Sequence, residues 1–126
     1  MSITPAVDNA RGRRDGSLVL FTWILLSANA DGLPVEIPEW ADRTWFVGSA
    51  GDVFGGATLS IEGSNDGVTF YTLANAAGGT PLTFTAGGCK TVIENPLFMR
   101  PNLTVVGAGA SITVSVLIRR PAALRQ

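Results

Sequence analysis

The chain has 126 residues, 46% of them hydrophobic and only 15% charged, and this length favours a single domain that buries its own core. The hydrophobic content excludes an intrinsically disordered chain, and the single cysteine excludes an internal disulfide. Because histidine, the usual general base and the commonest metal ligand, is absent, we expect a protein that is not an enzyme and that has no cofactor and no metal site.

Basic residues are concentrated at the two ends of the chain, where six of the nine are Arg11, Arg13, Arg14, Arg119, Arg120 and Arg125. After subtraction of Asp8 they give the first 14 residues a net charge of +2, and the last eight residues, which contain no acid, carry +3. Clustered charge of this kind is typical of interaction tails. We expect an N-terminal arm (1–16) and a C-terminal tail (121–126) that contact a partner, on either side of a domain spanning 17–120. The alternative that these arginines only solvate the chain ends stays open.

The apolar run Leu18–Leu26 (LVLFTWILL) is the first predicted strand, within Ser17–Ser27. Arginines before the run and a small-residue motif, Ala28–Ala30, after it resemble a secretory signal, but Asp15 interrupts the approach and the run is rich in strand-forming residues. It is also too short to span a membrane, which needs about 20 apolar residues. We therefore expect a strand that is buried on both faces, and no membrane partner.

Further strands are predicted as short runs between turn residues. They are Pro34–Trp40, Arg43–Val47, Ala57–Gly63, Val68–Leu73, Leu82–Thr85, Cys89–Glu94, Leu97–Val106 and Ser111–Arg119. Two prolines make Pro34–Trp40 an edge strand or an extended loop, and Pro101 indicates an edge or a bulge in its own strand. The four residues Ser64–Gly67 (SNDG) predict a tight hairpin, because asparagine, aspartate and glycine tolerate the backbone angles that such a turn needs.

No segment shows helical periodicity over eleven or more residues. About eight short strands, with turn signals about every ten residues, indicate an all-β antiparallel sandwich with extended N- and C-terminal arms. Periodicity leaves open whether the strand order is that of a jelly roll or is immunoglobulin-like.

Four aromatic residues are candidates for a stacking platform for sugars or bases: Trp23, Trp40, Trp45 and Tyr71. Trp23 and Trp45 lie in apolar strands, so we expect both in the core. Trp40 lies in the proline-containing segment next to Glu39 and close to Asp42, and is the better candidate for an exposed interface anchor. The acids of this segment indicate a solvated edge, and Ser64–Gly67 has too few oxygen ligands for a calcium loop.

Three stretches of the second half carry a resemblance: Ile61–Leu73 (IEGSNDGVTFYTL), Val92–Pro101 (VIENPLFMRP) and Val116–Arg120 (VLIRR). They are similar to a hairpin and strands that recur in small structural proteins of tailed bacteriophages, over about residues 57–120. The resemblance implies a β-sandwich virion protein, a head decoration (cement) protein on the outer capsid surface that is assembled in the host cytoplasm.

A cement protein binds across the seams between capsomers, and it stabilises only the assembled shell. Its expected partners are the major capsid protein and copies of itself, as a dimer or trimer. Nucleic acid is not expected, because no aromatic residues are interleaved with the arginines. The residues expected to contact partners are Arg11, Arg13, Arg14, Trp40, Arg119, Arg120 and Arg125. The alternative function is a carbohydrate-binding or adhesin-type module of a phage tail or cell surface, which requires exposed aromatic side chains with polar residues beside them.

Overall fold

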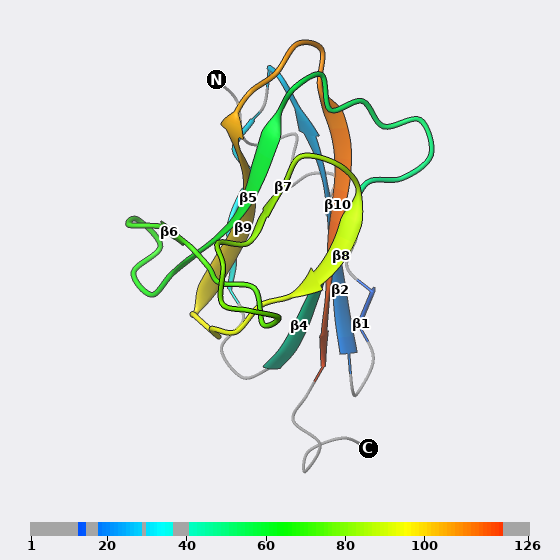
Figure 1. Ribbon diagram of the computed structural model, residues 1–126. Coiled ribbons are helices and arrows are strands. Elements are labelled where there is room, and N and C mark those ends of the chain that lie inside the picture. Colours follow the sequence, from blue (N-terminus) through cyan, green and yellow to red (C-terminus); the bar gives the residue numbers. More distant parts are fainter. Residues whose placement is uncertain (1–12, 15–17, 29, 37–40, 120–126) are drawn as a thin grey trace.

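The computed structural model describes residues 13–14, 18–28, 30–36 and 41–119. Over these ranges the chain forms ten strands in two antiparallel sheets that pack face to face as two layers (Figure 1). The predicted antiparallel β-sandwich is therefore confirmed. The one described strand without a predicted counterpart is β1 (Arg13–Arg14), which lies within the predicted N-terminal arm. The predicted strands at β3 (Val35–Glu36), β6 (Tyr71–Thr72) and β7 (Thr83–Phe84) are present but have only two residues each. No helix in the described ranges is long and apolar enough to cross a membrane.

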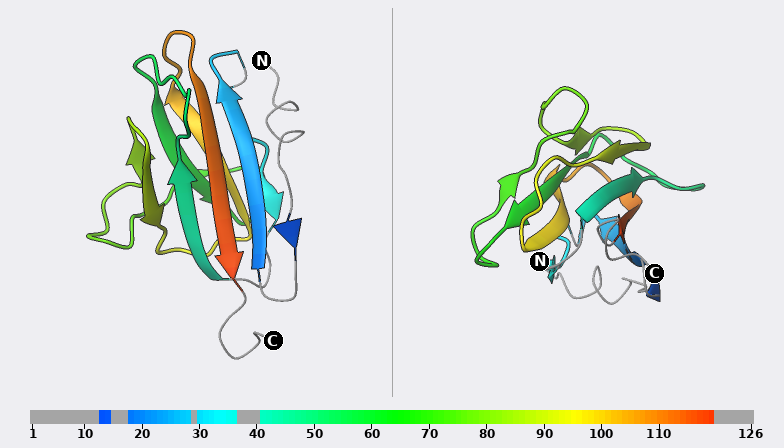
Figure 2. Two further views of the ribbon diagram at one scale, coloured as in Figure 1. Left: turned by 90° about the vertical axis from the view of Figure 1, so that its right-hand side faces the viewer. Right: turned by 90° about the horizontal axis from the view of Figure 1, so that it is seen from below.

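Sheet A contains five strands in the order β1-β2-β10-β4-β8. In that order they are β1 (Arg13–Arg14), β2 (Leu18–Leu26), β10 (Ser111–Arg119), β4 (Ala41–Val47) and β8 (Gly88–Thr91). β10 is the central strand, because it pairs with β2 from Ser111 opposite Leu26 to Arg119 opposite Leu18, and with β4 on its other side. Figure 2 (left) looks onto this sheet and shows β4, β10 and β2 side by side.

Sheet B has β9 and β5 at its centre and short strands at both edges. Its strands are β3 (Val35–Glu36), β9 (Phe98–Val105), β5 (Thr58–Ser64), β6 (Tyr71–Thr72) and β7 (Thr83–Phe84). β6 and β7 pair with different parts of the same strand, β5. In Figure 1 the hairpin formed by β5 and β6 extends away from the body of the sandwich.

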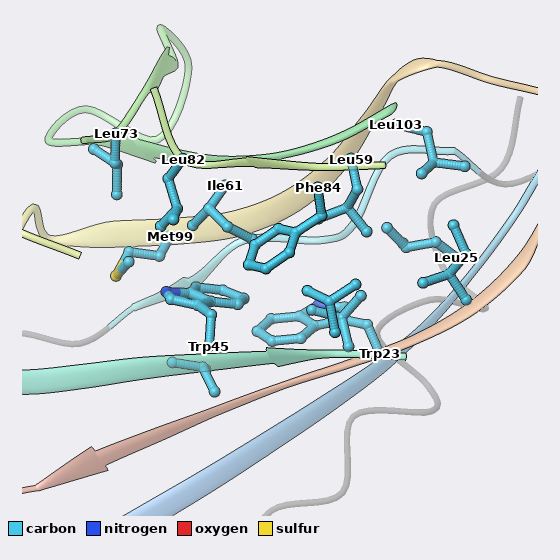
Figure 3. Packing of buried hydrophobic residues seen from close by; sticks show 14 of the residues in the cluster. Trp23, Leu25, Trp45, Leu59, Ile61, Leu73, Leu82, Phe84, Met99 and Leu103 are labelled. Carbon is cyan, nitrogen blue, oxygen red and sulfur yellow. The ribbon is translucent and has the colours of Figure 1, made fainter. Parts of the chain in front are cut away.

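The core lies between the two sheets and follows the alternation of side chains along each strand. Alternate residues of β10 are fully buried, namely Ile112, Val114, Val116 and Ile118. Trp23 of β2 and Trp45 of β4 are also fully buried, and their stacked rings have centroids 5.5 Å apart. Figure 3 shows both indoles facing side chains of sheet B, among them Phe84 and Met99. The two tryptophans predicted to be core residues are confirmed as such.

The two buried indoles differ in their hydrogen bonds. The indole nitrogen Nε1 of Trp23 donates to the carbonyl of Leu33 at 3.0 Å, which ties β2 to the segment before β3. Nε1 of Trp45 is buried with no hydrogen-bond partner among the described residues. Leaving a buried donor unpaired costs about 1–3 kcal/mol, so the two tryptophans contribute differently to stability despite similar packing.

Two buried residues are charged, Arg43 and Glu62, and Glu62 forms an ion pair with Arg100 of β9 at 2.9 Å. Arg43 of β4 donates from Nη1 to the carbonyl of Pro96 at 2.6 Å, and the same nitrogen lies 3.0 Å from Sδ of Met99. It therefore connects β4 to β9 and to the loop that precedes β9. Burial lowers the pKa of Arg43 to about 10, which leaves the guanidinium protonated at neutral pH.

The expectation that β2 is buried on both faces is wrong. Trp23 and Leu25 face the core, whereas Ile24 between them is 36% exposed and Thr22 is partly exposed. The physical reason is the two-layer architecture: over the described residues, sheet A has sheet B on one side only. The apolar character of β2 therefore continues onto an outer surface.

The predicted hairpin is present, but its loop is longer than the four residues Ser64–Gly67. β6 begins at Tyr71 instead of at Val68. The backbone amides of Val68 and Thr69 each donate to a carboxylate oxygen of Asp66 at 2.8 Å, so these amides bind a side chain and not a neighbouring strand.

Pro101 lies in a central strand and not at an edge, which corrects the expectation for this position. Its carbonyl accepts a hydrogen bond from the amide of Gly32 at 2.9 Å, on the side of the strand that faces away from β5. Because the carbonyl and the nitrogen of a strand residue point to the same side, the missing N–H of Pro101 removes no bond to β5. The register shift of this strand pair lies between Thr58 and Leu59, opposite Val105 and Leu103, so β9 has an irregularity but it does not lie at Pro101. The edge predicted for Pro34–Trp40 is confirmed where it is described, at β3.

Candidate functional site

The structure brings backbone segments from both basic chain ends to one end of sheet A. Arg14 in β1 pairs with Val19, and Arg119 at the end of β10 pairs with Leu18, so β2 lies between them. For Arg13, Arg14 and Arg119 only the backbone is described. The other residues predicted to contact partners lie outside the described residues: Arg11, Trp40, Arg120 and Arg125. Their partner contacts stay predictions.

The solvent-facing side of sheet A, here called the outer face, lies beside these segments. Strand register defines it as the even-numbered residues 20–26 of β2, the odd-numbered residues 111–117 of β10, Thr44 and Phe46 of β4, and Cys89 and Thr91 of β8. All of these positions hold either apolar side chains or side chains of serine, threonine and cysteine. Among the side chains described on this face none is charged.

Phe46 is the most prominent apolar group of the outer face. Its side chain is 51% exposed, and its neighbours across the strands are Ser115 on β10 and Cys89 on β8. Asp52 lies at the rim of the face, where its carboxylate accepts the backbone N–H of Thr113 at 2.7 Å. An exposed aromatic ring surrounded by small uncharged groups loses little hydration when it is covered, so this face is suited to bind another protein surface.

The β5–β6 hairpin carries the second candidate site, and its turn is fixed by Asp66. Oδ1 of Asp66 accepts the hydroxyl of Ser64 at 2.7 Å as well as the two backbone amides of Val68 and Thr69. These donors, first the amide of Thr69, lower the pKa of Asp66 to about 2. The interpretation of Ser64–Gly67 as a turn is therefore confirmed, and no group of three or more Cys, Asp or Glu side chains in the described residues could hold a metal ion.

A hollow of about 590 Å³, here called the hairpin hollow, opens between this turn and the segment that follows β8. Its lining includes Asn65, Asp66, Tyr71, Leu73, Glu94 and Pro96. Tyr71, one of the four aromatic residues considered for stacking, is 73% exposed, whereas Trp23 and Trp45 are buried. The hollow therefore places one open aromatic ring beside two carboxylates and an amide.

Sequence reasoning did not single out Glu94 or the amide of Asn65, because the partners that position them are distant in the chain. Oε1 of Glu94 accepts the backbone N–H of Ala74 at 2.8 Å, and Oδ1 of Asn65 accepts the N–H of Leu97 at 3.0 Å. These bonds join the hairpin to the loop before β9. No local pattern in either segment indicates that they meet.

Comparison with known proteins assigns no family. No family model matches the chain, and no curated protein matches its sequence. Among solved structures it is similar to protein NMB1881 from Neisseria meningitidis, with a TM-score of 0.38 and 14% sequence identity, over 84% of this chain and 79% of that chain. A likeness at this level carries no argument about function.

The ionised carboxylate of Asp66 is expected to hold the hairpin turn at all pH values above about 4. Its pKa in the folded chain is below the ordinary value, so its contribution to stability is present above the unfolded pKa and is lost as the pH falls towards about 2. NMR titration of the Val68 and Thr69 amide signals should give a midpoint near pH 2. A midpoint near pH 4 would show that the carboxylate does not accept these amides, and the Asp66→Asn variant, which cannot ionise, serves as the control.

Proposed function

We propose that the protein is a structural virion component, a head decoration (cement) protein that binds across capsomer seams on the outer capsid surface. Support from the sequence is the similarity of residues 57–120 to small structural proteins of tailed bacteriophages; strands β5 to β10 belong to this stretch. The observation that carries the proposal is the outer face of sheet A. Over its described side chains it offers a partner an uncharged, partly apolar surface, with backbone from both basic chain ends at one end of the sheet.

The outer face supplies the main binding energy in this proposal. Covering apolar groups such as Phe46 and Ile24 is worth about 25 cal/mol per Å² of apolar surface removed from water. The hydroxyl groups of the threonine and serine residues between them supply hydrogen bonds to the capsid. Because this contact forms only on an assembled shell, each bound copy stabilises the shell against opening without taking part in any reaction.

The basic chain ends supply orientation in this proposal. Charged contacts at the rim of an interface increase the association rate and fix the register more than they increase affinity. The arginines of both ends bind capsid carboxylates beside the outer face, and Trp40 anchors the interface at a position outside the described residues. Copies of the protein associate as a dimer or trimer, which fits two-fold or three-fold sites of a capsid.

Replacing Phe46 with lysine is expected to weaken decoration at least about tenfold without unfolding the sandwich. The substitution places a charge in the middle of the outer face, where binding would strip its hydration. The measurement is the number of copies bound per shell, by quantitative gel analysis of purified capsids assembled from the major capsid protein of the same genome.

The matched control is Val68→Lys, because Val68 is 82% exposed but lies on the hairpin loop, away from the outer face. Decoration by the control should equal that of the wild type. Full occupancy by Phe46→Lys, with an unchanged unfolding temperature, would exclude the outer face as the capsid-binding surface.

Deleting residues 2–12, which leaves β1 in place, tests the N-terminal arm separately and should also lower occupancy.

A further inference from the structure

The hairpin hollow has the composition of a ligand site, and its ligand need not be a capsid. The ring of Tyr71 is open to solvent over most of its surface, and the side chains of Leu73 and Pro96 also line the hollow. Binding sites for small molecules typically combine such apolar and aromatic surface with a few polar groups that fix orientation. A ligand that fits this hollow therefore combines an apolar face with a polar rim.

The polar groups of the hollow are held in place by backbone hydrogen bonds. Glu94 binds the amide of Ala74 with Oε1, which leaves Oε2 as an acceptor. The carbonyl oxygen of Asn65 accepts the amide of Leu97, so the NH₂ group of Asn65 remains as a donor. Asp66 is fixed by its own turn. A ligand with several hydroxyl groups finds fixed acceptors and a donor here without rearrangement of the site, which lowers the entropic cost of binding.

We propose that the hairpin hollow binds one sugar residue of a neutral glycan. A pyranose ring has an apolar face of C–H groups, which stacks on Tyr71, and a rim of hydroxyl groups, which donate to Glu94 and Asp66 and accept from Asn65. The lining contains two carboxylates and no lysine or arginine, so the site disfavours uronic acids and other anionic sugars. This site is independent of the outer face, and it gives the protein a second, surface-directed activity.

The position of the hollow is compatible with simultaneous use of both surfaces. The outer face belongs to sheet A, whereas the hairpin belongs to an edge of sheet B and extends away from the sandwich (Figure 1). A copy attached through sheet A therefore presents the hairpin on its other layer. When many copies are bound to one particle, their weak individual sugar contacts together give strong attachment.

The test is NMR titration of the isotope-labelled full chain with maltotriose, mannotriose and N,N′,N″-triacetylchitotriose. Each is added to about 20 mM, because shallow sites bind single sugars with dissociation constants of about 1 mM or weaker. We expect at least one of them to shift the amide signals of Asn65, Asp66, Tyr71 and Glu94. The Tyr71→Ala variant should bind at least about tenfold more weakly, because the stacking surface is lost.

The control is Val68→Ala, which removes another exposed side chain of the same hairpin outside the hollow and should bind as the wild type does. Because Tyr71 is 73% exposed, its replacement should leave the unfolding temperature unchanged, and this is measured in parallel. The proposal is overturned if none of the three sugars shifts these signals, or if Tyr71→Ala binds them as tightly as the wild type. Tighter binding of trigalacturonate or of a trilysine peptide would overturn it as well. None of these outcomes depends on capsid binding.

Discussion

Replacing Trp23 with alanine is expected to lower the free energy of unfolding by about 3–5 kcal/mol, a large part of the about 5–15 kcal/mol typical of a domain. Trp23 is fully buried and stacks on Trp45, so its removal leaves a cavity between the sheets. The hydrogen bond from its indole to the carbonyl of Leu33 is also lost. Urea unfolding followed by circular dichroism measures the change, with an unchanged m-value as the sign of an intact native state.

A matched pair of phenylalanine variants separates the hydrogen bond from the packing. Trp23→Phe leaves a smaller cavity and the carbonyl of Leu33 without its indole donor, whereas Trp45→Phe leaves a similar cavity and removes a buried donor that has no partner among the described residues. Trp45→Phe should therefore cost less, by about 1–3 kcal/mol. Equal losses for the two variants would contradict this difference in hydrogen bonding.

Gly55→Ala is expected to lower the free energy of unfolding by about 2–4 kcal/mol. Gly55 has a φ angle of 59°, and a Cβ atom at this position would collide with the backbone carbonyl oxygen of Ala108. The same two residues are joined by a hydrogen bond of 2.9 Å from the amide of Ala108 to the carbonyl of Gly55. The clash therefore disrupts the contact between the β4–β5 loop and the β9–β10 loop.

The neighbouring Gly56 provides the control for this clash. Its φ angle is 85°, but a Cβ atom there would meet no heavy atom within 4 Å. Gly56→Ala therefore carries only the cost of a left-handed backbone, about 1 kcal/mol. Thermal unfolding of both variants gives the comparison. Similar losses would mean that backbone strain, and not the collision with Ala108, dominates at Gly55.

The strict alternation of apolar residues with other residues predicts the strands that matter most for the core. In β10 every second residue is apolar, namely Ile112, Val114, Val116 and Ile118, and all four are buried. The apolar residues around Trp23 and Trp45 in the sequence likewise predict correctly that both indoles lie in the core. These predictions succeed because a period of two residues is a local property that the packed sheet preserves.

The failures at β2 and in the hairpin hollow come from contacts between distant segments. The exposure of the outer side of β2 depends on the number of layers in the fold, and a run of nine apolar residues gives no information about that number. The length of the hairpin loop depends on a competition for the amides of Val68 and Thr69, which the carboxylate of Asp66 wins. The position of Glu94 in the hairpin hollow depends on a bond to Ala74 across 20 residues. The exposure of β2 and the position of Glu94 cannot be found by reading neighbouring residues, whereas the bonds of Asp66 are local, to residues two and three positions further along the chain.

Cys89 provides the outer face with a thiol that can be labelled chemically. It is the single cysteine of the chain, it is exposed, and it lies directly across from Phe46. A small environment-sensitive dye coupled to its sulfur through a maleimide would therefore be attached at one defined spot without any engineering. Its emission would change when another surface covers the sheet, so the native polypeptide can be used as its own optical sensor of attachment.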